Sequence, residues 1–241
     1  MGQNVFSRFE IKYMLTRRER DALMIRLAEH MRADEYGKGT VCSLYFDTPD
    51  YRLVRASLEQ PVYKEKLRAR SYGTPGEDGQ VFVELKKKYK GVVYKRRVSM
   101  TLSEARDYLL RGIADPEGDC QIRRELDWTL KRYENLAPAM MISYDREAFC
   151  DKENPELRIT FDTNLRSRTD RLDLGCGPGG TALLAKGEHL MEIKVSGAMP
   201  LWLTNALDEL KLRKVSFTKY GTGYRRLILQ ESFAKGALYC A

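Results

Sequence analysis

The chain has 241 residues, enough for one large domain or two small ones with a substantial core. Its 42 basic and 34 acidic residues give a net charge of +8, which excludes a simple basic tail and suits an anionic partner such as a phosphate ligand, a nucleic acid or a membrane surface. Two histidines and five scattered cysteines without a C-x-x-C pair argue against a histidine-based metal site, a Ser-His-Asp triad and a disulfide framework.

The same composition bears on location and on metals. Reduced thiols are expected in a cytoplasmic protein, and the N-terminal segment lacks the apolar run of a signal peptide. No stretch has the length and apolarity of a transmembrane helix, and the question of a membrane partner stays open. Any metal would be held by carboxylates, which favours Mg²⁺ or Mn²⁺.

The first quarter of the chain predicts strand, helix, strand and a short helix. Residues 5–14 alternate between apolar and charged side chains, as a half-buried strand does. Thr16 begins a helix with Glu19 completing a capping box, and Gly37 and Gly39 act as breakers. Residues 40–47 form a second strand, and a turn at residues 48–50 leads into a short helix that ends near Glu59.

Three successive strands between residues 64 and 97 carry charges at every second position. Side chains on a strand alternate between its faces, so each strand directs its charges to one side. Like charges opposite one another are destabilising, so such a sheet needs full solvation or a polyanion in front of it. The charged members are Lys64, Lys66, Arg68 and Arg70 on the first strand, Glu84, Lys86 and Lys88 on the second, where Phe82 shares their face, and Lys95 and Arg97 on the third.

The remainder predicts further helices and strands, and the whole is an α+β protein with a largely antiparallel sheet of about eight strands. Ser103 is expected to cap a helix near residues 103–112. The other expected elements are a loop at 115–118, a helix at 121–135, strands at 139–149, 156–163, 165–172 and 188–195, a helix from Pro200 to about Leu212, and a final helix at 218–232.

Cations recur on the later strands. Arg146, Arg158 and Lys194 each lie within a strand pattern, and Glu192 shares a face with Lys194. A one-sided sheet with a solvated polar face is the plain interpretation of each strand alone. Together, the strands indicate a closed barrel with a cationic lumen and helices packed outside. Such a lumen would bind a chain of phosphates, while its few acids held a divalent cation.

These residues carry a resemblance to a known family. The chain resembles the VTC domain, the polyphosphate polymerase domain of the vacuolar transporter chaperone complex, within the triphosphate tunnel metalloenzymes and the CYTH-like proteins. The matching segments are RFEIKY at 8–13, SLYFDT at 43–48, KLRARSYG at 66–73, VELKKK at 83–88, YKRRV at 94–98, YDREAF at 144–149, LRITFDTNL at 157–165, MEIKV at 191–195 and FTKY at 217–220.

The resemblance implies one domain over residues 1–241, built as an antiparallel eight-stranded tunnel that binds triphosphate with Mg²⁺ or Mn²⁺. Catalytic positioning would come from Arg68, Arg70, Lys86 and Arg146. Phosphate contacts would come from Lys12, Lys66, Lys95, Arg97, Arg158, Lys194 and Lys219, of which Lys66, Arg158 and Lys194 follow from their strand positions. Glu192 matches the metal carboxylate, with Glu84 and Glu10 as further acidic contributors.

Two departures from the family pattern refine the expectation. The CYTH signature E-x-E-x-K is replaced by Arg8-x-Glu10-x-Lys12, which favours the VTC branch over a CYTH adenylate cyclase or thiamine triphosphatase. Ser216 stands before FTKY where eukaryotic relatives often have a basic residue. The fungal proteins also carry an SPX domain and transmembrane helices, which this sequence does not show.

The expected function is metal-dependent phosphoryl transfer, with ATP, triphosphate or polyphosphate as ligand and polyphosphate synthesis from the γ-phosphate of ATP as the reaction. The same cradle with water as acceptor would be a triphosphatase, and a polyphosphate-binding module without turnover is a third alternative. A nucleic-acid-binding sheet, with bases stacked on Tyr63, Tyr72, Tyr89 and Tyr94, is the fourth, and no nucleic acid is expected.

Overall fold

A computed structural model describes residues 8–59, 61–90, 92–113 and 120–229. Within these residues the chain forms an antiparallel sheet with helices, which confirms the α+β class. The strands follow the order β1 (Arg8–Leu15), β9 (His189–Ser196), β7 (Arg158–Arg168), β6 (Ala137–Asp151), β2 (Met31–Asp47), β3 (Tyr63–Tyr72), β4 (Gln80–Tyr89) and β5 (Val92–Thr101), and the short β8 (Thr181–Ala182) pairs with β7.

The predicted closure of this sheet into a barrel is not confirmed. Strand pairing among the described residues stops at β1 on one side and at β5 on the other. The chain divides into two compact units, each with its own core. Unit 1 comprises the described parts of Met1–Gly39, Tyr144–Leu165 and Leu184–Phe217, and unit 2 those of Thr40–Ser143, Arg166–Leu183 and Thr218–Ala241. The single domain over residues 1–241 stays a prediction.

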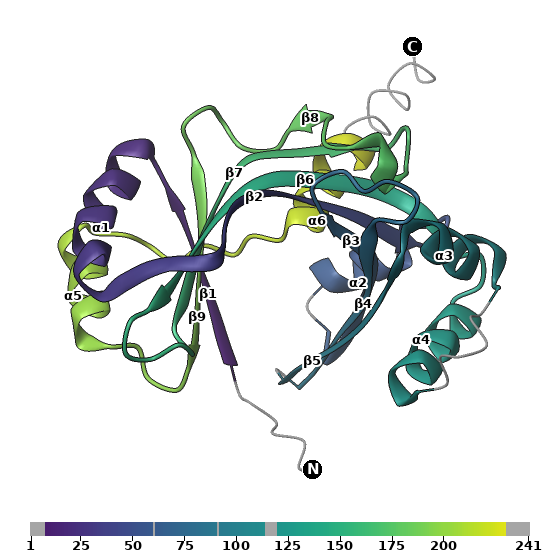
Figure 1. Ribbon diagram of the computed structural model, residues 1–241, viewed down its shortest axis with the longest axis horizontal. Coiled ribbons are helices and arrows are strands. Elements are labelled where there is room, and N and C mark those ends of the chain that lie inside the picture. The colour runs from purple at the N-terminus through teal and green to yellow at the C-terminus, as the bar shows by residue number, and fades with distance from the viewer. Residues whose placement is uncertain (1–7, 60, 91, 114–119, 230–241) are drawn as a thin grey trace. The chain divides into compact units, whose positions relative to one another are not determined.

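Unit 1 has an apolar strand face covered by two helices. Ile159, Met191 and Ile193 of paired strands are buried against Leu23 and Leu27 of α1 (Arg17–His30). Helix α5 (Leu201–Glu209) begins after Pro200 as predicted, and it lies beside α1 (Figure 1). The predicted capping box is confirmed, since the Thr16 hydroxyl accepts from the Glu19 backbone while the Glu19 carboxylate accepts from the Thr16 backbone.

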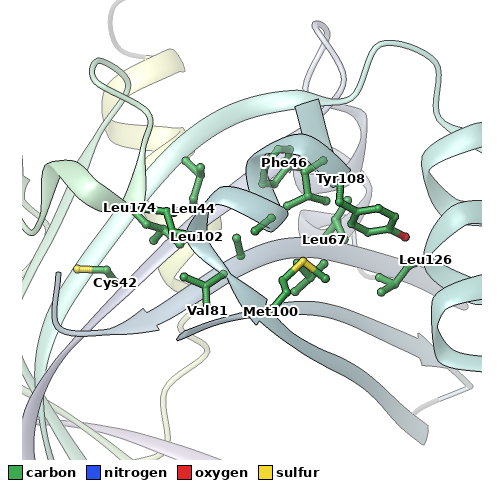
Figure 2. Close-up of a cluster of buried hydrophobic side chains, with 14 of the residues drawn as sticks. Cys42, Leu44, Phe46, Leu67, Val81, Met100, Leu102, Tyr108, Leu126 and Leu174 are labelled. Carbon is green, nitrogen blue, oxygen red and sulfur yellow. The ribbon is translucent and has the colours of Figure 1, made fainter. Parts of the chain in front are cut away.

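Unit 2 is built on the three predicted charged strands, which pair in sequence as β3, β4 and β5. Their apolar face forms a core with helix α3 (Leu102–Arg106), the following π-helical turn (Asp107–Arg111) and α4 (Gln121–Arg132) (Figure 1). Figure 2 shows this core, with Leu67, Val81 and Met100 of the strands near Leu102 and Tyr108 of the helical side. Helix α2 (Arg52–Leu58) contacts β3.

Several predicted boundaries are wrong for local physical reasons. Strand β2 already begins at Met31, so Gly37 and Gly39 lie within a strand instead of breaking the chain. The helix near residue 103 is capped by Thr101, whose hydroxyl accepts from the backbone of Glu104 in a capping box that Ser103 cannot make.

Two further predictions differ in continuity or fall outside the described residues. Strand β7 runs unbroken over Arg158–Arg168, where two strands were predicted. The final helix consists of α6 (Lys219–Gly223) and a π-helical stretch (Tyr224–Leu229). The loop at 115–118 and residues 230–232 lie outside the described residues. No described helix has the length and apolar character needed to cross a membrane.

Candidate functional site

The cationic face of unit 2 is defined by strand register. Tyr45 of β2 pairs with Arg68 of β3, Arg68 with Glu84 of β4, and Glu84 with Arg97 of β5. Because directly paired residues point to the same side of a sheet, these side chains form one row across four strands. The neighbouring row is Lys66, Lys86 and Lys95. The alternation predicted for residues 64–97 therefore brings its cations together on one face.

Glu84 is the centre of an arginine cluster. Arg68 donates to Glu84 Oε2 from Nε at 2.7 Å and approaches it with Nη2 at 2.6 Å. Arg97 donates to Oε1 from Nε at 2.8 Å and also from Nη2. Arg70 Nε lies 3.8 Å from Oε2. Burial alone would raise the pKa of the Glu84 carboxyl, but these three guanidinium groups outweigh it and lower that pKa to about 2.

This arrangement leaves an excess of positive charge. Three arginines share one carboxylate, and the row beside them adds three lysines. Lys66 Nζ donates to Thr218 Oγ1 at 3.0 Å, and Lys95 is exposed. Planar guanidinium groups suit bidentate contacts to phosphate, and ammonium groups act as point charges, so this face can hold a polyanion.

Helix α6 brings Lys219 into unit 2 through close packing at two glycines. A Cβ atom at Gly221 would lie 2.7 Å from Leu58 Cδ2, and one at Gly223 would lie 2.5 Å from Met140 Sδ. The adjacent Tyr220 is buried and stacks on Tyr45 with ring centroids 4.6 Å apart. The glycines of the KYGTG segment therefore allow close approach to neighbouring side chains, and the half-buried Lys219 lies at the helix start.

Unit 1 carries a second face with mixed charge. Lys12 of β1 pairs with Glu192 of β9, and Glu192 with Thr160 of β7. Lys12 Nζ lies 3.4 Å from Glu192 Oε1 and donates to the Phe217 carbonyl at 2.9 Å. Glu192 is only 8% exposed. The predicted metal carboxylate and a predicted phosphate lysine are thus direct neighbours.

Arg146 is fixed on this face by a residue that the sequence interpretation missed. Its Nε and Nη2 donate to the two carboxylate oxygens of Asp162 at 2.6 and 2.8 Å, and Nη2 lies 3.7 Å from Glu192 Oε2. Burial alone would lower the pKa of Arg146, but Tyr144, Asp162 and Glu192 outweigh it and raise that pKa well above its usual value. Arg146 is therefore a permanent cation.

The remaining predicted residues of unit 1 lie in the row next to that of Lys12 and Glu192. In this row Glu10, Lys194 and Arg158 are paired across β1, β9 and β7. Arg158 also forms an ion pair with Asp34, a buried residue of β2. All the predicted residues in unit 1 thus lie on one strand face, opposite the apolar face of Ile159 and Ile193. Their roles as phosphate or metal ligands stay predictions.

The donor set permits a weak carboxylate metal site in unit 1 and disfavours one at Glu84. No group of three or more His, Cys, Asp or Glu side chains with metal-binding geometry occurs among the described residues. Mg²⁺ commonly uses one or two carboxylates and takes its other ligands from water and substrate phosphates. Glu192 and Glu10, diagonal neighbours on paired strands, fit that pattern. Glu84 does not, because its oxygens already accept from arginines.

Three polar residues of these faces were not predicted. Tyr45 and Ser43 belong to β2, where Tyr45 accepts from Arg68 and the Ser43 hydroxyl accepts from Arg70 Nε at 3.2 Å. Asp162 has the same strand parity as Arg158 in LRITFD, which was the available signal. Tyr45 and Ser43 gave no comparable signal, because Ser and Tyr within SLYFDT also suit an ordinary strand.

A family model described as the VTC domain matches residues 7–228. The chain belongs to the VTC domain family. A search of curated proteins found no match for this VTC domain.

Two solved structures resemble the VTC domain in fold. A candidate adenylate cyclase from Bacillus halodurans superposes with a TM-score of 0.53 at 16% identity, covering 95% of this chain and 100% of that one. A candidate adenylyl cyclase from Hippeastrum, described as having a dominant triphosphatase activity, gives 0.52 at 14% identity, covering 90% of this chain and 94% of that one. At such low identity the likeness establishes the fold alone.

Proposed function

We propose that this VTC domain catalyses metal-dependent phosphoryl transfer on a triphosphate-type substrate, with polyphosphate synthesis from ATP as the reaction. The observation that carries the proposal is the paired rows of arginine and lysine on β3, β4 and β5, which concentrate positive charge around a single carboxylate. Phosphoryl transfer depends on positioning and charge stabilisation more than on covalent chemistry by the protein, so such a face supplies what the reaction needs.

The residues take the following roles in this proposal. Arg68, Arg70 and Lys86 bind and orient the phosphates of the donor, with Lys66, Lys95, Arg97 and Lys219 as further phosphate contacts. Glu84 keeps the arginine side chains aligned, because its carboxylate accepts from Arg68 and Arg97 at once. Since these donors are fixed before substrate arrives, little reorganisation is required on binding.

Unit 1, taken by itself, offers a candidate cation site and candidate phosphate contacts. Glu192, assisted by Glu10, would hold Mg²⁺ or Mn²⁺, which supplies neutralisation of phosphate oxygens when bound. Lys12, Arg146, Arg158 and Lys194 contact acceptor or chain phosphates. Arg146 stays charged because of Asp162 and Glu192, so this contact does not weaken with pH. We also propose that the protein is cytoplasmic and that any link to a membrane is made through a partner.

Hydrolysis of triphosphate is the second candidate, because water can replace the phosphate acceptor on the same face. The fold likeness to the Hippeastrum protein, described as a triphosphatase, favours it. The replacement of the first CYTH glutamate by Arg8 favours the polymerase instead.

The deciding experiment incubates the purified full chain with ATP and Mn²⁺ or Mg²⁺ and resolves the products on a polyphosphate gel. Polymerase activity gives phosphate chains longer than the donor together with ADP. Orthophosphate as the sole phosphate product would replace the polymerase with the hydrolase. Binding of tripolyphosphate without turnover in either metal would leave a binding module. Absence of both binding and turnover would overturn the proposal.

A further inference from the structure

Tyr45 is a buried phenol at the edge of the arginine cluster. Only 5% of the residue is exposed, and its oxygen accepts a hydrogen bond from Arg68 Nη1 at 3.0 Å. The other nitrogens of that guanidinium, Nε and Nη2, contact Glu84 Oε2. Arg68 is therefore held from two sides, by a carboxylate on β4 and by a phenol on β2, and the plane of its guanidinium group is fixed.

One face of the Tyr45 ring is covered by the ring of Tyr220. The two rings stack with centroids 4.6 Å apart, and the Tyr220 hydroxyl donates to Asp47 Oδ2 at 2.8 Å. Asp47 also accepts from the backbone of Leu53 and Val54 at the start of α2. The carboxylate of Asp47 is thus bound by Tyr220, whereas the Tyr45 oxygen accepts from the cation Arg68.

The charge around Tyr45 is predominantly positive. Lys66, Arg68 and Arg70 face it from β3, with Glu84 of β4 and Arg97 of β5 beyond Arg68. Tyr220 of α6 and Asp47 of β2 lie on its other side. Burial alone would raise the pKa of Tyr45, but the charges of Arg68, Lys66 and Arg70 outweigh it and lower that pKa to about 8.

Other buried tyrosines of unit 2 behave in the opposite way. Tyr133 donates to Glu65 at 3.0 Å and Tyr108 to Asp127 at 2.7 Å. Burial and these carboxylates together raise the pKa of both phenols, in Tyr133 to about 12. The sign of the partner's charge, and not burial, therefore separates Tyr45 from Tyr133 and Tyr108.

We propose that Tyr45 positions Arg68 and that its ionised fraction takes up a proton from solvent when a polyphosphate-type anion binds the arginine cluster. The inference rests on the proposed function only in that this cluster binds such an anion. In the free protein the cations stabilise the phenolate, O⁻. Once phosphates neutralise Arg68, Arg70 and Lys66, that stabilisation is lost and the oxygen becomes protonated. The phenol O–H bond forms with a proton that water or a buffer acid gives up, and no other bond of the protein or the anion changes.

The consequence is a link between pH and affinity. Because the bound form holds up to one proton more, affinity for the anion must fall as pH rises past the ionisation of Tyr45. Relative to a protein without the phenol, this fall reaches up to about tenfold per pH unit. Tyr45→Phe keeps the ring and its stack on Tyr220 and removes only the oxygen.

The test is calorimetric titration of the full chain with tripolyphosphate at about pH 8, in buffers of different ionisation enthalpy, for wild type, Y45F and Y133F. The dependence of the observed heat on the buffer gives the number of protons taken up, and protonation of the ligand itself cancels between variants. Near its pKa about half of Tyr45 is ionised, so Y45F should take up about half a proton less than wild type. Y133F, the matched buried tyrosine, should equal wild type.

An ultraviolet titration of tyrosinate gives an independent measurement. If Tyr45 had only a structural role, tripolyphosphate would not shift the pH at which it ionises. Wild type should show one ionisation step near pH 8 that tripolyphosphate shifts to higher pH, and Y45F should lack it. Equal proton uptake in wild type and Y45F, with Arg68→Ala still weakening binding, would overturn the role of Tyr45 and leave the proposed function intact. Failure of the wild type to bind tripolyphosphate would overturn both.

Discussion

Asp162 holds Arg146 through two parallel hydrogen bonds, from Nε to Oδ1 at 2.6 Å and from Nη2 to Oδ2 at 2.8 Å. Asp162 is fully buried, and the Arg146 side chain is 17% exposed. A planar guanidinium bound in this way by a carboxylate can neither rotate nor lose its charge. Asp162 therefore acts as a positioning residue for Arg146, with no need to contact substrate.

Asp162→Ala should destabilise unit 1 strongly. The substitution leaves Arg146 buried with Glu192 as its remaining carboxylate neighbour at 3.7 Å. Removal of one partner from a buried ion pair costs about 3–5 kcal/mol of unfolding free energy. Urea denaturation of wild type and of Asp162→Ala would measure the loss of unfolding free energy. Asp170→Asn, which breaks the exposed pair with Arg171, is the matched control and should cost far less. Equal losses in the two variants would contradict the assignment.

Glu84 should make the protein sensitive to acid. Its pKa is lowered from 4.5 to about 2, so its ionisation stabilises the folded state above about pH 4.5 and this stabilisation is lost as pH falls through about 2. Glu84→Gln should show a shallower decline of unfolding free energy over that window, measured by denaturant titrations at a series of pH values. Glu77→Gln, an exposed carboxylate paired with Arg106, should keep the steep decline of wild type.

Lys86 and Lys87 are adjacent in sequence but lie on opposite faces of β4. Lys86 is paired between Lys66 and Lys95, whereas Lys87 lies 3.3 Å from Glu125 of α4. Lys86→Gln should raise the stability of the ligand-free protein by about 0.2–1 kcal/mol, because like charges opposite one another repel. It should also reduce the thermal stabilisation given by tripolyphosphate.

Lys87→Gln is the control with the opposite pattern. It should lower the ligand-free stability slightly, because it removes an ion pair, and should leave the stabilisation by tripolyphosphate unchanged. Thermal unfolding with and without ligand, at low and high salt, measures both effects. If Lys87→Gln lost more of the thermal stabilisation by tripolyphosphate than Lys86→Gln, the phosphate contacts would lie on the face of Lys87, and the prediction would be wrong.

Glu192→Gln should separate cation binding from phosphate binding. The variant keeps the size of the side chain but loses the charge that a divalent cation requires. We expect weaker Mn²⁺ binding in the presence of tripolyphosphate, measured by the paramagnetic signal of free Mn²⁺. Binding of tripolyphosphate without metal should be unchanged or stronger, because one negative charge is removed from the face. Glu188→Gln, at a partly buried residue just before β9, should bind Mn²⁺ as wild type does.

The strands and the charged faces were readily predicted from the sequence, because both follow from alternation. Residues 64–97 fold into the three predicted strands, and pairing places Arg68, Glu84 and Arg97 in one row. The capping box of Thr16 and Glu19 was equally accessible, since both partners lie within one turn. Such features depend on neighbours in the chain or on strand period.

Long-range partners and continuity were harder to predict. Asp162 reaches Arg146 from a different strand, and Tyr220 reaches Asp47 across 173 positions of sequence. The pattern also suggested a break at Gly37 and Gly39, where β2 continues because strand pairing overrides local glycine preference. The expectation for Glu84 differs most from the structure. A carboxylate within a basic strand suggests a metal ligand, but three arginines surround this one.

The alternation within β4 decides which of its residues face the core and which face the charged side, so it affects both stability and chemistry. Val83 and Leu85 are buried in the core while Glu84 and Lys86 belong to the opposite face. Loss or gain of a single residue here would exchange the two sets, placing cations in the core and apolar side chains before the ligand. This strand can therefore diversify by substitution but not by change of length, and its two surfaces must evolve together.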